Sequence, residues 1–290
     1  MQEGGNAQQV LFHPVPIPPD KSGTLVSITR DQAGWQTLNF SVRRLLRGQY
    51  WQSDTGAEEA ALVALGGKFS VDWGAGPKTI GHRANVFSGY PYAVYLPART
   101  AFEVSAETSC EFADCRAPSE ARLAPRVITP RDIRLEIRGG GNATRQILDI
   151  IRPEFPADRL LICEVYTPSG NWSSYPPHKH DVHNMPVEAD LDETYYYRID
   201  HPAGYAFQRL YDAAGTRDIT LKVADGDVVL IKDGYHPVVA AYGYNVYYLN
   251  VLAGSARSFA ASDDPRYAHL RKSWPAPDRR VPLVRPETAH

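Results

Sequence analysis

The sequence predicts an all-β fold built from two β-barrels or β-sandwiches in tandem. Most of the 290 residues fall into short runs rich in β-branched and aromatic residues, which favour strands over helices. Gly, Pro, Asn and Asp separate these runs, as they do in hairpins and tight turns. The two halves also show a weak internal sequence similarity, since Glu58-Glu59 and Asp192-Glu193 each precede a run that alternates like a strand. This similarity indicates that one such domain is repeated.

The first half is expected to consist of hairpins. Residues 60–73 read AALVALGGKFSVDW, which is typical of two strands joined by a Gly-Gly turn. Residues 92–97 and 102–106 form a second pair of runs around a turn that begins at Pro97. Residues 1–130 are therefore assigned to the first domain.

A short helix is expected to link the two domains. Asn142 is a suitable N-cap for residues 143–151, whose apolar side chains would share one face of a helix. Pro153 would end that helix, because proline cannot continue the backbone hydrogen bonding.

The second domain is assigned to residues 131–262. Its strands are expected at five apolar runs, namely 194–199, 206–211, 218–223, 227–232 and 244–252. The remaining residues, 263–290, are rich in Pro and Arg and predict an extended tail that crosses the surface.

Composition argues against several classes of function. The formal net charge of -2 gives no electrostatic signature for a nucleic-acid or membrane partner. No segment approaches the about 20 consecutive apolar residues that a membrane span needs. Cys110, Cys115 and Cys163 form no C-x-x-C pair, which favours buried thiols in a reducing compartment. Because residues 1–14 lack an apolar leader of secretory length, a cytoplasmic protein is expected.

Residues 171–198 carry the pattern with the most chemical content. His178 and His180 are two residues apart, so on a strand both imidazoles lie on one face and can converge on a metal. Glu193 opens the next strand, and His236 follows a Gly-rich hairpin. Three imidazoles and one carboxylate form a mixed site suited to a divalent metal such as Zn, Mn, Fe or Ni.

The carboxylate ligand has competitors. An acidic insertion separates His180 from Glu193, and several of its side chains could bind metal instead. They are Asp181, His183, Glu188, Asp190 and Asp192. Glu193 is preferred because it directly enters an alternating aromatic strand, with Tyr195 and Tyr197 on the same face, as a ligand inside a barrel should.

At these residues the sequence resembles the 5-deoxy-glucuronate isomerase family, cupin enzymes of bacterial myo-inositol breakdown. The matching stretches are 33–42, 83–97, 164–181, 193–198, 207–211, 225–238 and 247–254. Two features depart from the usual cupin pattern: the long insertion before Glu193, and Lys232 where proline is usual.

The resemblance implies a bicupin fold. The first half contains no H-x-H, so the first domain is expected to lack a metal. The resemblance also implies an aldose–ketose isomerisation of 5-deoxy-D-glucuronate to 5-dehydro-2-deoxy-D-gluconate. A sister family that acts on 5-keto-4-deoxyuronate carries zinc on a similar ligand set, so zinc is the expected metal. The alternatives are another metal-dependent cupin, such as a uronate isomerase or a dioxygenase, and a non-catalytic sugar-binding cupin.

This reaction requires a positioned group that moves a proton between neighbouring carbons. The candidates are Glu164, Lys179, Tyr211 and Tyr248. Glu164 and Tyr248 are assigned as catalytic, while Lys179 and Tyr211 are assigned to substrate binding.

The far end of such a substrate is a carboxylate, which arginine binds with two parallel hydrogen bonds. Arg209 is preferred over Arg198 for this role, because Arg198 has the opposite strand parity to Glu193. Gln208 could instead point inward and bind a sugar hydroxyl, since neighbouring residues on a strand face opposite sides. The expected partner is a small sugar acid, and the chain could also form a homo-oligomer.

Overall fold

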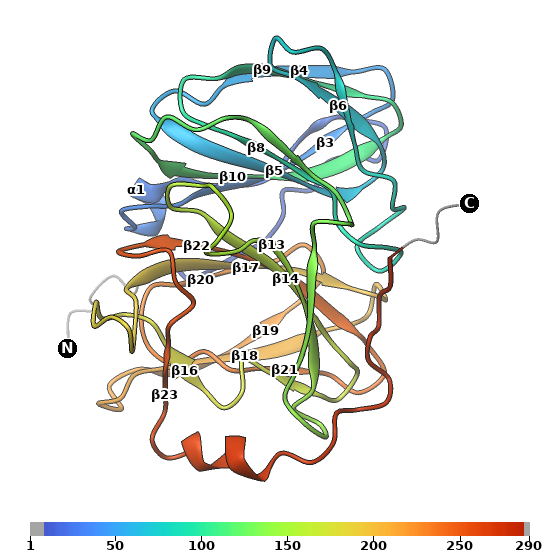
Figure 1. Cartoon of the computed structure of the whole chain (residues 1–290). Coiled ribbons are helices and arrows are strands. Elements are labelled where there is room, and N and C mark those ends of the chain that lie inside the picture. The colour runs from blue at the N-terminus through green and yellow to red at the C-terminus, as the bar shows by residue number, and fades with distance from the viewer. Residues whose placement is uncertain (1–8, 287–290) are drawn as a thin grey trace, which may run out of the picture.

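The computed structural model describes residues 9–286, which form two β-sandwiches stacked on one another (Figure 1). Apart from the first short strand, the N-terminal strands, blue to green, build the first sandwich, and the strands from green to red build the second. Each sandwich contains one larger and one smaller antiparallel sheet. The prediction of an all-β fold with two tandem domains is confirmed.

The first sandwich combines a six-stranded and a four-stranded sheet. In sheet order, the larger contains β11 (Arg126–Ile128), β8 (Ala93–Leu96), β5 (Glu58–Gly66), β10 (Cys110–Pro118), β3 (Asn39–Leu45) and β2 (Gly23–Ile28). The smaller contains β4 (Tyr50–Asp54), β9 (Ala101–Ala106), β6 (Phe69–Asp72) and β7 (Lys78–Ile80). One helical turn, α1 (Arg30–Ala33), lies between β2 and β3.

The second sandwich has a seven-stranded sheet. In sheet order, it contains β1 (Leu11–Phe12), β20 (Val228–Ile231), β17 (Leu191–Ile199), β22 (Val246–Gly254), β14 (Leu161–Thr167), β13 (Arg145–Ile151) and β12 (Arg134–Arg138). A four-stranded sheet contains β15 (Trp172–Ser173), β21 (Val238–Ala240), β18 (Ala206–Tyr211) and β19 (Asp218–Val223). A small ladder joins β16 (His178–Lys179) to β23 (Ser262–Asp263).

The two ends of the chain pack on the second sandwich. Strand β1 pairs with β20, so the first described strand belongs to the second sandwich. The C-terminal tail includes a short 3-10 helix, η1 (Ala268–Ser273), which interrupts the predicted extended segment. Farther along, Val284 is buried and exchanges two hydrogen bonds with the side chain of Gln146.

The predicted linking helix is wrong, because Arg145–Ile151 forms β13 between β12 and β14. Its side chains alternate between two buried faces. Leu148 and Ile150 contact the core between the sandwiches, whereas Ile147 lies in the core of the second sandwich. A strand buried on both faces yields a continuous apolar run, which periodicity alone cannot distinguish from a short buried helix. Within residues 9–286, no helix is long and apolar enough to cross a membrane.

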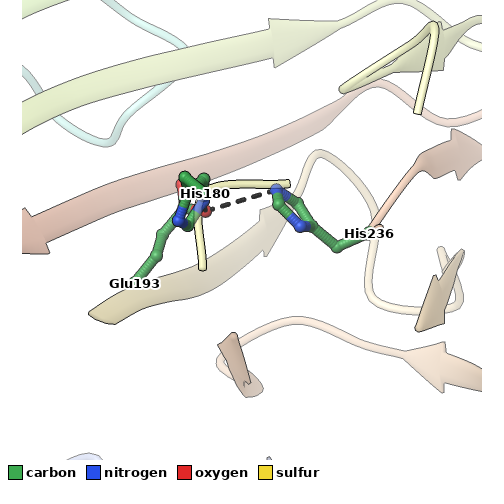
Figure 2. A group of neighbouring side chains, drawn as sticks. All are labelled: His180, Glu193 and His236. Carbon is green, nitrogen blue, oxygen red and sulfur yellow. Dashed lines mark hydrogen bonds and ion pairs between the residues drawn. The ribbon is translucent and has the colours of Figure 1, made fainter. Parts of the chain in front are cut away.

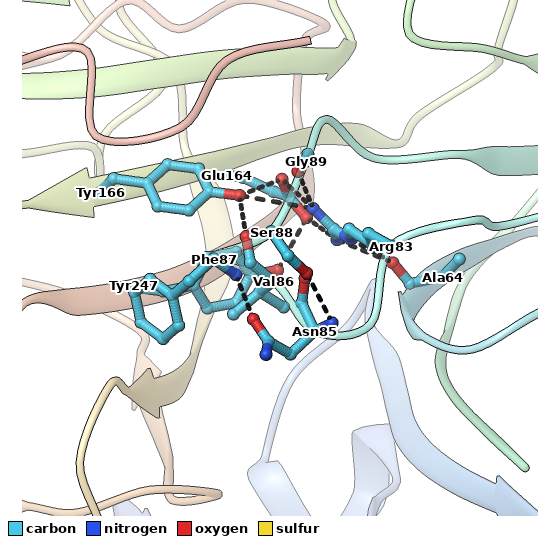
Figure 3. Close-up of polar contacts among 10 residues, drawn as sticks. All are labelled: Ala64, Arg83, Asn85, Val86, Phe87, Ser88, Gly89, Glu164, Tyr166 and Tyr247. Carbon is cyan, nitrogen blue, oxygen red and sulfur yellow. Dashed lines mark hydrogen bonds and ion pairs between the residues drawn. The ribbon is translucent and has the colours of Figure 1, made fainter. Parts of the chain in front are cut away.

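The larger sheets of the two sandwiches pack face to face around one apolar core. A buried ion pair crosses this interface (Figure 3). Arg83 of the first sandwich donates from Nη1 to Glu164 Oε2 at 3.0 Å. The hydroxyl groups of Tyr166 and Tyr247 each donate to Glu164 at 2.9 Å. Burial by itself lowers the pKa of Arg83, but the charge of Glu164 outweighs it and raises that pKa, so the guanidinium stays charged.

Candidate metal centre

Three buried side chains from separate segments of the second sandwich converge on one point (Figure 2). Glu193 lies on β17, His180 directly follows β16, and His236 lies between β20 and β21. One ligand atom from each lies within 4.8 Å of the others. Glu193 Oε2 is 2.9 Å from His180 Nε2 and 3.4 Å from His236 Nε2. We call these three residues the His-Glu-His cluster.

Backbone carbonyl groups orient both imidazoles of the cluster. Nδ1 of His180 faces the carbonyl oxygen of Leu191 at 3.0 Å, and Nδ1 of His236 faces that of Gly234 at 3.0 Å. A proton held on Nδ1 by such a carbonyl leaves Nε2 to act as a metal ligand. His236 Nε2 is buried and forms no hydrogen bond within residues 9–286. Two nitrogen donors and one carboxylate, with one nitrogen unsatisfied, fit a divalent metal.

His178 lies at the edge of the cluster. Its ring centre is 4.9 Å from that of His236 and 6.5 Å from that of His180. Nδ1 of His178 faces the carbonyl oxygen of Pro176 at 3.4 Å, which matches the orientation of the other two rings. His178 is not within the 4.8 Å grouping, so its role as a fourth ligand stays a prediction.

Burial controls the protonation of these groups. It lowers the pKa of His236 to about 3 and holds the pKa of His178 well below its usual value. Burial also acts to lower the pKa of His180, but the hydrogen bond and charge of Glu193 outweigh it and raise that pKa. His178 and His236 are therefore neutral at physiological pH, which is the form of histidine that binds metal.

The acidic loop that precedes Glu193 is held by contacts of its own. Glu188 accepts hydrogen bonds from the Lys179 ammonium group at 2.7 Å and from two backbone N–H groups of the loop. Asp181 contacts the same ammonium group. Asp192 accepts hydrogen bonds from Thr37 of the first sandwich. Of the competing carboxylates, Glu193 is the one that the structure brings into the cluster.

A pocket opens beside the cluster and encloses about 650 Å³ of space, part of it open to solvent. Strands β17, which carries Glu193, β22, β14, β13 and β12 of the large sheet line it, together with His178 and His180 from the segment at β16. Polar side chains beyond the histidines and Glu193 also line it: Arg138, Arg145, Asp149, Ser174, Tyr195, Tyr248 and Asn250. These charged, hydroxyl and amide side chains suit a small polar ligand, because a few placed polar groups fix the orientation of a bound molecule.

Sequence comparison places the chain in a family. A sequence model of the KduI/IolB family matches residues 15–270. The chain belongs to the KduI/IolB family. The curated 5-deoxy-glucuronate isomerase of Geobacillus thermodenitrificans is 43% identical, over 88% of this chain and 94% of that protein. Its counterpart in Bacillus subtilis strain 168 is 39% identical, over 83% of this chain and 90% of that protein.

Solved structures show the same fold as this KduI/IolB chain. An IolB-like protein of Salmonella typhimurium LT2 superposes with a TM-score of 0.86 at 36% identity, over 90% of this chain and 98% of that one. An oxalate decarboxylase of Lactobacillus farciminis, at 12% identity and a TM-score of 0.65 over 90% of each chain, shares the fold alone. The bicupin fold class predicted from the sequence is confirmed.

The two residues predicted to be catalytic in the KduI/IolB chain lie on opposite faces of the large sheet. Tyr248 lines the pocket, and its ring centre is 4.7 Å from that of Tyr195. Glu164 points away from the pocket into the ion pair with Arg83, while its strand neighbours Cys163 and Val165 face the pocket. The structure therefore contradicts a catalytic role for Glu164, because strand parity directs its carboxylate to the other side.

The four predicted substrate-binding residues do not line this pocket. The Arg209 guanidinium pairs with Asp218 at the surface, with Nη2 2.6 Å from Oδ2. Lys179 is held in the acidic loop. Both cations already have carboxylate partners, so neither is available as predicted.

Gln208 and Tyr211 are buried rather than exposed to the pocket. Gln208 does point inward, which was the alternative to an inward Arg209. However, its Oε1 accepts a hydrogen bond from the Tyr197 hydroxyl at 2.9 Å. The Tyr211 hydroxyl donates to Asp264 Oδ2 at 2.7 Å. Gln208 and Tyr211 therefore contribute to the interior of the second sandwich and not to the pocket.

Sequence reasoning missed the polar residues that β12 and β13 contribute. Arg145 and Asp149 are four residues apart on β13 and line the same pocket, as does Arg138 on β12. On a helix Arg145 and Asp149 would lie side by side on one polar face, where they could satisfy each other, so the helix assignment concealed their role in a pocket. The alternation R-x-I-x-D over residues 145–149 was the available signal.

Proposed function

We propose that this chain is a 5-deoxy-glucuronate isomerase, which converts 5-deoxy-D-glucuronate into 5-dehydro-2-deoxy-D-gluconate in myo-inositol catabolism. Curated relatives with that name match most of both chains. The observation that carries the proposal is the buried His-Glu-His cluster, whose residues His180 and Glu193 line a pocket rich in polar side chains. Such a site combines a metal position with polar groups suited to a sugar acid.

The reaction moves a hydrogen from C2 of the aldehyde sugar to C1 and a proton from the C2 hydroxyl to the C1 oxygen, which leaves a ketone at C2. Its main barrier is the negative charge that develops on oxygen as the C2 proton leaves. We propose that His180, Glu193 and His236, with His178 as fourth ligand, hold a zinc ion. When bound, zinc supplies Lewis-acid polarisation of the substrate oxygens.

Tyr248 is proposed as the hydrogen-bond donor to the developing oxyanion. Burial raises the pKa of Tyr248 to about 12, so its hydroxyl keeps its proton at physiological pH. The Ser173 hydroxyl contacts that of Tyr248 and fixes its position. Because Ser173 can donate this hydrogen bond, the Tyr248 proton is available to a substrate oxygen.

The test is incubation of the purified metal-containing protein with 5-deoxy-D-glucuronate in D2O, followed by NMR. We expect ketose product with deuterium at C1, because a base that exchanges with solvent would carry the proton. Product without deuterium would still support the isomerisation and indicate a shielded transfer. No product, with metal shown to be bound by elemental analysis, would contradict the proposed function.

We also propose a cytoplasmic location. The cysteines Cys110, Cys115 and Cys163 are all buried and unpaired. Burial raises the pKa of each thiol, which keeps it protonated and unreactive. Free buried thiols are typical of proteins in a reducing compartment.

A further inference from the structure

Arg145 is a buried cation that faces the pocket. Its side chain lies on β13 and the residue is 2% exposed. Nη1 donates hydrogen bonds to the carbonyl oxygens of Tyr175 at 2.9 Å and of Ala143 at 3.1 Å. Burial lowers the pKa of Arg145 to about 10, which still leaves the guanidinium charged at neutral pH. Within residues 9–286, no carboxylate forms an ion pair with it.

The neighbouring arginine of the pocket is already neutralised. Arg138 is the cross-strand partner of Arg145 in the β12–β13 ladder. Two of its nitrogens donate to the Glu136 carboxylate at 2.7 and 2.8 Å. Asp149 lies four residues from Arg145, which is about 13 Å along a strand and too far for direct pairing. Of the two pocket arginines, Arg145 is therefore the one that lacks a counter-ion.

A buried unpaired charge destabilises a folded protein, so its presence in a pocket calls for an anionic ligand. Guanidinium matches a carboxylate through two parallel hydrogen bonds. The location is suitable, because the sheet order places β22 and β14 between β13 and the β17 strand that carries Glu193. Tyr248 on β22 lies between these two ends, so one ligand could span from the cluster past Tyr248 to Arg145.

We propose that Arg145 binds the carboxylate of the substrate and thereby selects uronic acids over uncharged aldoses. This assignment replaces the sequence prediction of Arg209, whose guanidinium is paired with Asp218 outside the pocket. The identity of the sugar acid rests on the proposed function. The preference for a carboxylate rests on Arg145 alone and can be tested separately.

The first experiment compares two substrates on the metal-containing protein. They are 5-deoxy-D-glucuronate and 5-deoxy-D-glucose, which carries an alcohol in place of the carboxylate. Arg145→Met should lower the ratio of kcat/KM for the acid to that for the alcohol by about 10- to 100-fold, mainly through KM. Arg145→Lys should recover part of this loss, because it restores the charge but not the planar fork.

Arg209→Lys is the matched control and should leave both substrates unaffected. An equal loss on both substrates in Arg145→Met, or a lowered ratio in Arg209→Lys alone, would overturn the proposal. Thermal melting of each variant shows whether it is folded.

A second experiment separates this inference from the proposed function. Calorimetry would measure the binding of D-glucuronate and of D-glucose to the wild-type protein and to Arg145→Met. We expect weaker binding of glucuronate in the variant, by about 10-fold or more, with glucose unchanged. This result would support the carboxylate site even if 5-deoxy-glucuronate is not isomerised. Equal glucuronate affinity of the two proteins would overturn it even if isomerisation is observed.

Discussion

Glu193 and Glu188 are both buried carboxylates, yet their surroundings differ. Glu193 Oε2 lies within 3.4 Å of two imidazole nitrogens, whereas Glu188 is surrounded by donors of its own loop. The histidines could be predicted from the sequence because the H-x-H spacing is local. Arg145 could not, because its lack of a counter-ion depends on which distant side chains lie near it.

Glu193→Gln should therefore remove most of the bound metal. Mutation of a residue that only orients a ligand weakens metal affinity by about 10- to 100-fold. Loss of a ligand itself should weaken it more. Glu188→Gln is the matched control, and it should retain stoichiometric metal although its loop is weakened. Elemental analysis after dialysis measures both. Equal metal content in the two variants would show that Glu193 is not a ligand.

Metal affinity should also depend on pH through His180. Despite burial, the hydrogen bond and charge of Glu193 raise the pKa of His180 above 6.5. Since metal binds the neutral imidazole, affinity should be full above this raised pKa and fall as pH drops through it. Competition with a chelator at a series of pH values measures this. A metal affinity that did not change across the titration of His180 would contradict its assignment as a ligand.

At the scale of elements, β13 joins the interface core to the pocket. Leu148 is fully buried on the face toward the first sandwich, whereas Arg145, Ile147 and Asp149 face the pocket. Local sequence could not reveal this division. The face that carries Leu148 is buried because the first sandwich covers it, and that packing comes from residues far away in the chain.

Leu148→Ala should lower the free energy of unfolding by about 2–5 kcal/mol, because it leaves a cavity in the interface core. Leu135 is its cross-strand partner on β12 and is 42% exposed. Leu135→Ala should therefore change stability by only about 0.5 kcal/mol or less. Chemical denaturation measures both values. A similar cost for the two variants would argue against the burial of this face of β13.

At the scale of the whole molecule, the sandwiches are interlocked rather than merely tethered. Strand β1 extends the sheet of the second sandwich, and the Arg83–Glu164 pair crosses the interface. The repeated pattern of short strands predicted the tandem arrangement. The pairing of β1 with β20 and the buried ion pair were not predictable, since each joins segments far apart in the sequence.

A double-mutant cycle tests the ion pair. Arg83→Met and Glu164→Leu should each lower the free energy of unfolding by about 3–5 kcal/mol, because each leaves an uncompensated buried charge. The double variant should lose less than the sum of the two and should retain its kcat/KM. Urea denaturation and steady-state kinetics measure these quantities. A folded, metal-loaded Glu164→Leu protein without activity would restore Glu164 as a catalytic candidate.

The most direct test of the metal-dependent isomerase is the removal and return of metal. The protein would be treated with a chelator, dialysed, and assayed by NMR for conversion of 5-deoxy-D-glucuronate before and after addition of stoichiometric zinc. We expect the metal-free protein to stay folded but inactive, and zinc to restore turnover. Full turnover by protein shown to be free of metal would contradict the central role of the His180, Glu193 and His236 cluster.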